Sequence, residues 1–215
     1  MRVPGGPMFD IDAKIPAGAS EKEVSEMLQA LLEDRFKLAL HRGTKEGEVL
    51  ALVPAKDGLK LQPASADSAG AATPSVPPDT IPAGEIETHV VPSADGSGRT
   101  TIFSSPRMGT VRETDLPNRT QRWEAASISM AGLTEILDVA GPWEPPVVDA
   151  TGSRQRFQLE FEVTLSRPGD PRDMENDHIA AFNDGLRKLG LQLVKRKGAV
   201  ETLVIDHLEK TPTGN

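Results

Sequence analysis

Residues 20–40 read SEKEVSEMLQALLEDRFKLAL, and this stretch indicates the fold class. Ser20 stands three residues before Glu23, an arrangement typical of the capping box that begins a helix. The apolar residues that follow recur at helical spacing on one face, which predicts a helix over about residues 21–34. The residues of this apolar stripe are Val24, Met27, Leu28, Leu31 and Leu32.

The segments on both sides of this helix have the alternation of half-buried strands. Apolar side chains occupy every second position directly after the helix, at Phe36, Leu38 and Leu40. Residues 45–47 (Lys-Glu-Gly) predict a turn, and residues 49–53 predict the returning strand of a hairpin. Residues 9–13 alternate in the same way before the helix. We therefore expect a βαββ unit over residues 8–62.

A change of composition marks the expected boundary of this unit. Residues 63–100 are rich in Pro, Ala, Ser and Gly, and such a segment buries too little apolar surface to offset its ordering entropy. We expect a flexible linker or long loop here, with one short strand at residues 86–91. The remaining residues, 101–210, are expected to form a second α+β region.

The end of the chain predicts a second helix and hairpin. Asn176 and Asp177 are candidate caps of a helix that Gly190 ends in the left-handed conformation. A hairpin follows, with strands at residues 191–195 and 200–205. Shifted by 155 positions, the apolar pattern of the first unit matches this one, which indicates an internal repeat. Chance agreement between two amphipathic segments is the competing explanation.

The middle of the second region predicts a further unit. Residues 123–128 are typical of a strand, and Ser129 caps a helix that ends at Gly141. A short strand is expected at residues 147–148 and a longer one at residues 157–163. The fold class is therefore α+β, with two or three βαββ units that share a core.

Composition excludes several classes of function. The chain has 215 residues, a net charge of −8 and no Cys. An acidic chain repels phosphate backbones, so we expect no nucleic-acid partner, and the lack of Cys excludes disulfides and cysteine-ligated zinc. No apolar run reaches the length of about 18 residues that a transmembrane helix needs. Residues 1–7 lack the apolar region of a signal peptide.

No catalytic, cofactor or metal motif is evident, and three residues remain as weak catalytic candidates. His41 lies on a predicted strand without an evident partner, and Asp149 follows a short predicted strand. His207 follows Asp206 directly, and neighbours on a strand point to opposite faces, so these two residues are not expected to pair. The four His residues do not show metal-ligand spacing. We expect no metal and no cofactor.

Four blocks of sequence resemble a large uncharacterised family that is abundant in soil bacteria and is known mainly as a domain of unknown function. The blocks are LLEDRFKLALHR at 31–42, GLKL at 58–61, PVVDATG at 146–152, and LGLQL at 189–193 with VIDHLEK at 204–210. Members usually carry an export signal, and some are joined to membrane-bound sensor metallopeptidases. The resemblance implies a periplasmic or secreted protein, although this chain shows no signal peptide; the cytoplasm is the alternative location.

The sequence departs from the family pattern at one turn. Ala150 stands where members usually have Lys, and residues 153–155 replace a Leu-Thr-Gly run. This departure argues against an invariant active centre at Asp149. The predicted βαββ units are also similar to the short domains of secretins and outer-membrane receptors, which bind other proteins, but a shared fold does not confer function.

Three hypotheses for function follow. The first is a non-catalytic envelope or extracellular module that binds a protein or peptide, for example at an exposed strand edge. The second is a hydrolase with a dispersed site involving His41, Asp149 or His207. The third is a regulatory domain linked to a membrane sensor. The sequence does not indicate the oligomeric state.

Overall fold

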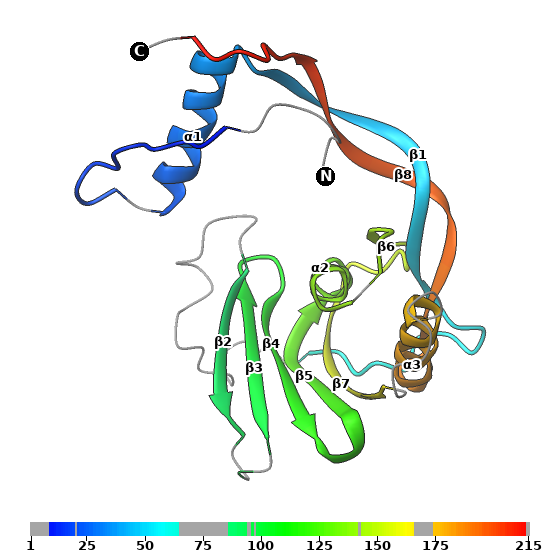
Figure 1. Ribbon diagram of the computed structural model, residues 1–215. Helices are drawn as coiled ribbons and strands as arrows, with labels where there is room; N and C mark the ends of the chain where they lie inside the picture. The colour runs from blue at the N-terminus through cyan, green and yellow to red at the C-terminus, as the bar shows by residue number, and fades with distance from the viewer. Residues whose placement is uncertain are drawn as a thin grey trace. The chain divides into compact units, whose positions relative to one another are not determined.

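The structure, a computed structural model, has the α+β fold class that the sequence predicts (Figure 1). It describes residues 9–19, 21–64, 86–93, 96, 98–141, 143–165 and 174–213. The chain divides into two compact units, each described by itself below. Unit 1 comprises residues 1–45 and 201–215, and unit 2 comprises residues 46–200. The boundary expected at residues 63–100 stays a prediction, because most of that segment lies outside the described residues.

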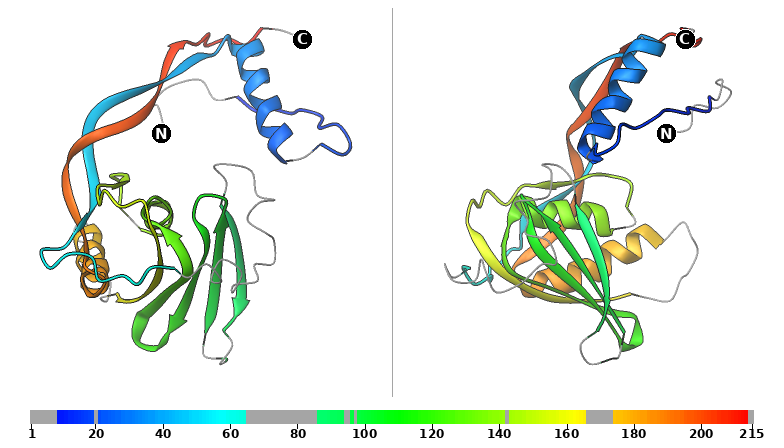
Figure 2. Two further views of the ribbon diagram at one scale, coloured as in Figure 1. Left: turned by 180° about the vertical axis from the view of Figure 1, so that it is seen from behind. Right: turned by 90° about the vertical axis from the view of Figure 1, so that its left-hand side faces the viewer.

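Unit 2 contains a five-stranded antiparallel sheet with the strand order β2-β3-β4-β5-β7 (Figures 1 and 2). Strands adjacent in the sheet are also adjacent in sequence, except that α2 and β6 come between β5 and β7. The strands are β2 (Glu87–Pro92), β3 (Arg99–Ser105), β4 (Gly109–Leu116), β5 (Thr120–Ser129) and β7 (Arg156–Thr164). The predictions of strands at residues 86–91, 123–128 and 157–163 are confirmed.

One face of this sheet carries the core of unit 2. Helices α2 (Met130–Ala140) and α3 (Met174–Lys188) contribute apolar side chains to the same buried cluster. At its centre, the ring of Trp123 lies 6.0 Å from the ring of Phe103 and 6.2 Å from that of Phe182 on α3. Along β7 buried and exposed side chains alternate strictly, which is typical of a sheet with one covered face. Ser129 caps α2 as predicted, because its side chain accepts a hydrogen bond from the amide of Gly132.

A second sheet has the strand order β6-β1-β8. β1 (Ala39–Pro54) pairs in parallel with β6 (Val147–Asp149), with Leu50 opposite Val147. β8 (Leu191–His207) lies on the other side of β1. Residues 49–52 of β1 have no exposed surface, since β1 is the middle strand of this sheet and Leu50 and Leu52 belong to the buried core cluster.

The prediction of a hairpin after each of the two helices, with turns at residues 45–47 and 197–198, is wrong. Residues 45–47 and 197–198, expected as turns, lie inside the long strands β1 and β8. The glycines mark close approaches between these two strands instead. A Cβ atom on Gly47 would lie 3.0 Å from a methyl group of Val200, and one on Gly198 would lie 2.9 Å from a methyl group of Val49. Glycine inside a strand therefore serves packing here, not chain reversal.

Other local expectations are also corrected. Residues 9–13 form no strand; instead the ring of Phe9 packs edge-on against Phe36, with 5.1 Å between the ring centroids. Helix α3 begins at Met174, so Asp177 lies in its first turn and is not the cap. The predicted capping box at Ser20 lies outside the described residues. The internal repeat stays a prediction.

Unit 1 contains helix α1 (Glu21–Phe36), residues 39–45 of β1, residues 201–207 of β8 and the segment that follows β8. The predicted helix at residues 21–34 is thus confirmed. The segment after β8 closes the carboxyl end of α1, where helical carbonyl groups lack partners within the helix. The amide of Glu209 donates to the carbonyl of Phe36 at 2.7 Å, and the amide of Thr213 donates to the carbonyl of Arg35 at 2.8 Å.

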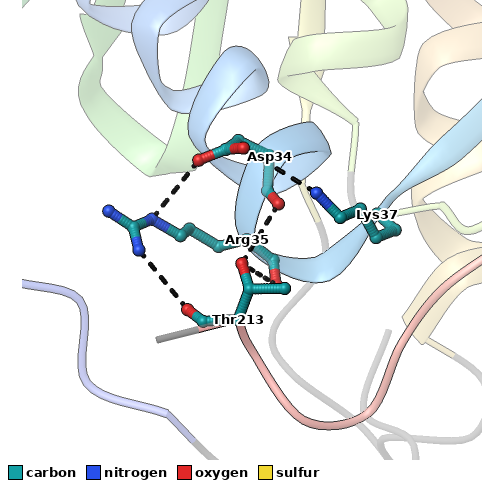
Figure 3. A network of polar contacts seen from close by, with 4 residues as sticks. All are labelled: Asp34, Arg35, Lys37 and Thr213. Atoms are coloured by element: carbon teal, nitrogen blue, oxygen red, sulfur yellow. Dashed lines mark hydrogen bonds and ion pairs between the residues drawn. The ribbon is translucent and has the colours of Figure 1, made fainter. Parts of the chain in front are cut away.

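Side chains reinforce this closure (Figure 3). The guanidinium group of Arg35 donates to the carbonyl of Thr213 at 3.4 Å, and the Thr213 hydroxyl donates to the carbonyl of Asp34 at 3.3 Å. The Asp34 carboxylate in turn forms ion pairs with Arg35 and Lys37. Residues 34–37 and 209–213 are therefore held together although about 175 residues separate them in sequence. These contacts join the two chain segments that make up unit 1.

None of the helices in the described part of the chain is long and apolar enough to cross a membrane.

Candidate functional site

His41 has a carboxylate partner that the sequence did not reveal. It lies on β1 in unit 1, and its Nδ1 atom is 2.7 Å from Oδ2 of Asp206 on β8. The two side chains are 58% and 48% exposed, so the pair lies at the surface. A carboxylate in this position can orient an imidazole, as in acid–base catalysis.

The other two candidate residues, His207 and Asp149, have different partners from the His41–Asp206 pair. Nε2 of His207 lies 3.9 Å from the carboxylate of Glu209. Asp149 belongs to unit 2, where its carboxylate accepts hydrogen bonds from the amide and hydroxyl groups of Thr151, both at 2.8 Å. This arrangement is typical of a turn closed by an aspartate side chain. Among the described residues, no group of three or more His, Cys, Asp or Glu residues is placed to hold a metal ion.

The two strand segments of unit 1, residues 39–45 and 201–207, form a two-stranded structure that we call the ribbon. His41 and Asp206 lie on one face of the ribbon, where Gly43 also approaches Val204. Because side chains alternate along a strand, Arg42 and Glu201 lie on the opposite face, and their side chains are joined by a 2.8 Å ion pair. The hydrogen bond to Glu201 raises the pKa of Arg42 above its ordinary value.

The face that carries Arg42 is also apolar. By the same alternation it includes Leu40 on β1 together with Leu203 and Ile205 on β8. These three side chains are 47%, 64% and 59% exposed. Apolar side chains at every second position of a strand are normally buried against another layer of the protein. On this face of the ribbon they are exposed to solvent instead.

The edges of the ribbon are also unpaired in the described part of the chain. β6 pairs with β1 only at Leu50 to Leu52, which lie outside the ribbon. β8 is the edge strand of its sheet. The outward amide and carbonyl groups of both ribbon segments are therefore available to another strand.

Unit 1 as a whole concentrates exposed apolar side chains. Of the fifteen large hydrophobic residues that are exposed in the described ranges, ten belong to unit 1, which holds little more than a quarter of the chain. The only large hydrophobic residue of unit 1 that is buried in these ranges is Phe36. The ten are Phe9, Ile11, Ile15, Met27, Leu28, Leu40, Leu203, Val204, Ile205 and Leu208.

Residues 6–208 match the sequence profile of a protein family described as "protein of unknown function (DUF3738)". The chain belongs to this family. The DUF3738 match covers both ribbon segments, the His41–Asp206 pair and all of unit 2. Searches of curated proteins and of solved structures found no match. The resemblance expected from the four sequence blocks is thereby confirmed at the level of the family.

In this DUF3738 chain, sequence reasoning identified His41 but missed its partner Asp206 and the apolar face of the ribbon. The sequence contains part of the signal, because residues 203–205 form an apolar run typical of a strand. By itself this run predicts the return strand of a local hairpin. The true pairing joins His41 to a residue 165 positions away, and no local pattern encodes that register.

Proposed function

We propose that unit 1 is a non-catalytic binding module, and that it takes up an extended segment of a partner protein as an additional strand beside the ribbon. The observation that carries this proposal is the concentration of exposed large hydrophobic residues in unit 1. Contiguous exposed apolar surface on a folded protein is typical of an interaction site.

The energetics of unit 1 support a partner. An isolated two-stranded ribbon is at best marginally stable in water, because it buries little apolar surface. Burial of the side chains of Leu40, Leu203 and Ile205 would each contribute about 1 kcal/mol or more, since each now keeps about half of its surface in contact with water. A ligand that covers this face stabilises the ribbon by mass action.

The ribbon favours an extended strand over a helix as the occupant. Its edges offer unpaired backbone groups, and main-chain hydrogen bonds supply affinity in strand addition. The apolar residues recur with period two, so a bound strand presents every second side chain to Leu203 and Ile205. We place this activity in the bacterial envelope or outside the cell, on the strength of the export signals that usual members of the family carry.

The test uses peptides selected from a displayed random library against the full chain. We expect the selected peptides to be apolar at alternate positions and to slow amide hydrogen exchange at residues 39–45 and 201–207. The variant Ile205→Lys is expected to weaken their binding about tenfold or more, because a charge replaces an apolar contact on the ribbon face. Val139→Lys is the matched control, since Val139 lies in unit 2 and is similarly exposed, at 55%.

Three results would contradict the proposal. One is that peptides carrying N-methyl groups on alternate amides bind as tightly as unmodified ones, because strand addition needs those amides. Another is that the peptides protect residues of unit 2 alone. The third is that the chain dimerises in sedimentation experiments and Ile205→Lys makes it monomeric, which would identify a second copy as the occupant.

A hydrolase is the alternative candidate, and the His41–Asp206 pair favours it. In such an enzyme His41 acts as the general base and Asp206 orients the imidazole ring. The test is hydrolysis of ester and amide substrates by the full chain and by the variants His41→Asn and Asp206→Asn. Activity that disappears in both variants, with unchanged melting temperatures, would favour the hydrolase; equal turnover by all three proteins would exclude this pair.

A further inference from the structure

Residues 9–15 of unit 1, with the sequence FDIDAKI, have the pattern of a strand but do not form one. Apolar and polar residues alternate strictly along the segment, as in a half-buried strand. In the part of the chain that the structure describes, no hydrogen bond or ion pair involves these residues. The side chains of Phe9, Ile11 and Ile15 are 44%, 49% and 58% exposed. The segment therefore lacks the neighbouring strand and the cover that its pattern favours.

The ribbon lacks the same kind of partner within the same unit. Its exposed apolar residues Leu203 and Ile205 recur with period two, and β8 is the edge strand of its sheet. A strand added to this edge needs free backbone groups and apolar side chains at alternate positions. Residues 9–15 offer both. The segment and the ribbon are therefore complementary surfaces that occur in one compact unit.

The segment begins beside one end of the ribbon. The ring of Phe9 packs against that of Phe36, with 5.1 Å between the centroids. Phe36 is the last residue of α1, and β1 begins shortly after it at Ala39. The carbonyl of Phe36 also accepts the hydrogen bond from the amide of Glu209, which closely follows the end of β8. One end of each ribbon strand therefore lies near Phe9.

The connection to α1 is long enough for the segment to lie along the ribbon. A strand that starts at the Phe36 end runs antiparallel to β8, and antiparallel pairing is the more stable kind. If residues 9–13 form this strand, residues 14–20 span up to about 25 Å when they are extended. Helix α1 has 16 residues and is therefore about 24 Å long. The start of α1 thus stays within reach, and the helix need not unwind.

We propose that residues 9–15 are a strap that closes on the ribbon as an added strand, and that a partner segment displaces it. The regulatory meaning of the strap rests on the proposed function, because the strap controls access to the same surface. In the closed state Phe9, Ile11 and Ala13 lie on the apolar face of the ribbon, and the acidic residues between them lie on the opposite face. Because the strap belongs to the same chain, it competes with a partner at high effective concentration. The structure shows the open state, in which the ribbon can accept a partner.

Engineered cysteines test the closure directly, because the chain has no Cys of its own. Ile11→Cys is combined with Leu203→Cys or with Ile205→Cys in the full chain, and each double variant is oxidised. Opposite side chains of paired strands lie close enough for a disulfide. Asp12→Cys with the same partners is the matched control, since neighbouring residues of a strand point to opposite faces. We expect one of the Ile11 pairs to form an intramolecular disulfide about fivefold faster than its Asp12 control.

A peptide with the sequence of the strap, acetyl-FDIDAKI-amide, tests the competition. We expect it to bind the full chain, and to bind the variant Ile11→Asn about threefold more tightly, because a weakened strap leaves the ribbon free more often. A threefold gain corresponds to a strap that covers the ribbon about two thirds of the time. Asp12→Asn is the matched control, since Asp12 lies on the other side of the strap, and it is expected to leave the affinity unchanged. Calorimetry measures the three affinities.

Loss of folding does not obscure these tests, because Ile11 and Asp12 are both exposed. The strap is contradicted if the Ile11 and Asp12 pairs form disulfides equally fast, or if the disulfide joins two chains. It is also contradicted if Ile11→Asn leaves the affinity for the strap peptide unchanged.

The strap and the binding module fail on different results. If peptides from the library bind the ribbon and the strap peptide does not, the binding module stands and the strap is wrong. If the Ile11 disulfide forms and the strap peptide binds, but the library yields no ribbon-binding peptide, the closure stands and the proposed function is wrong.

Discussion

Asn183 shows how a single polar residue joins two elements of unit 2. It is 8% exposed on α3, and its side chain forms two hydrogen bonds with the backbone of Leu193 on β8. The Leu193 amide donates to Oδ1 at 2.6 Å, and Nδ2 donates to the Leu193 carbonyl at 3.0 Å. The amide side chain thus takes the place of a neighbouring strand at this point of β8.

Asn183→Ala is expected to lower the free energy of unfolding by about 3 kcal/mol. The substitution leaves one buried donor and one buried acceptor of Leu193 without partners, and each costs about 1–3 kcal/mol. Urea denaturation followed by circular dichroism measures the change. Asn176→Ala on the same helix is the control, because the hydrogen bond that Asn176 accepts from Lys195 is exposed, and we expect its effect to stay below about 1 kcal/mol. Equal effects in the two variants would contradict this interpretation.

Elements in this protein begin and end where backbone geometry requires it, and the junction of α3 with β8 is the clearest example. Gly190 has a φ angle of +74° and directly precedes β8, as its sequence context predicts. The structure adds a second constraint, because a Cβ atom here would lie 1.9 Å from the carbonyl oxygen of Gly58. The helix can therefore end here only with glycine.

Gly190→Ala is expected to cost about 3 kcal/mol or more of stability, from left-handed strain together with a backbone collision that no side-chain movement relieves. Gly152→Ala is the matched control. Gly152 has a similar φ angle, +71°, but open space where the Cβ atom would lie, so strain alone should cost about 1 kcal/mol. Thermal denaturation of both variants separates strain from collision; equal losses would show that the approach of Gly58 does not matter.

At the scale of the whole molecule, the two units differ in how much apolar surface they bury. Unit 2 carries the large cluster around Trp123, including the wholly buried residues Leu133 and Leu186. In the described part of unit 1, Phe36 is the buried large hydrophobic residue, and Phe9 packs on it. Because stability follows buried apolar area, we expect unit 1 to open before unit 2.

Phe36→Ala is expected to unfold unit 1 locally and to leave unit 2 folded. Truncation of a buried Phe costs about 3–5 kcal/mol, which exceeds what such a small core supplies. Amide hydrogen exchange should show lost protection at residues 21–45 and 201–213 and unchanged protection in β5 and β7. Leu137→Ala in unit 2 should instead lower protection throughout unit 2. A uniform loss in Phe36→Ala would show that the chain unfolds as one cooperative unit.

Part of the candidate site could be predicted from local sequence, and part depends on residues that are distant in sequence. His41 was identifiable from the sequence, because an imidazole on a strand is visible without knowledge of the fold. Its partner Asp206 was not identifiable, since the pairing depends on the register of two strands that are distant in sequence. A shift of one residue in that register would place Asp206 on the other face.

The sequence alone determined the features that arise from neighbouring residues: helix α1, the Ser129 cap, the glycine that ends α3, and the alternation along β7. These follow from short-range sterics and periodicity. Only the tertiary structure decided that residues 45–47 and 197–198 lie inside long strands. The reason is that β1 pairs with β8, so neither segment forms a local hairpin. A glycine beside charged residues fits a turn and a close strand contact equally well, and the distant partner strand selects between them.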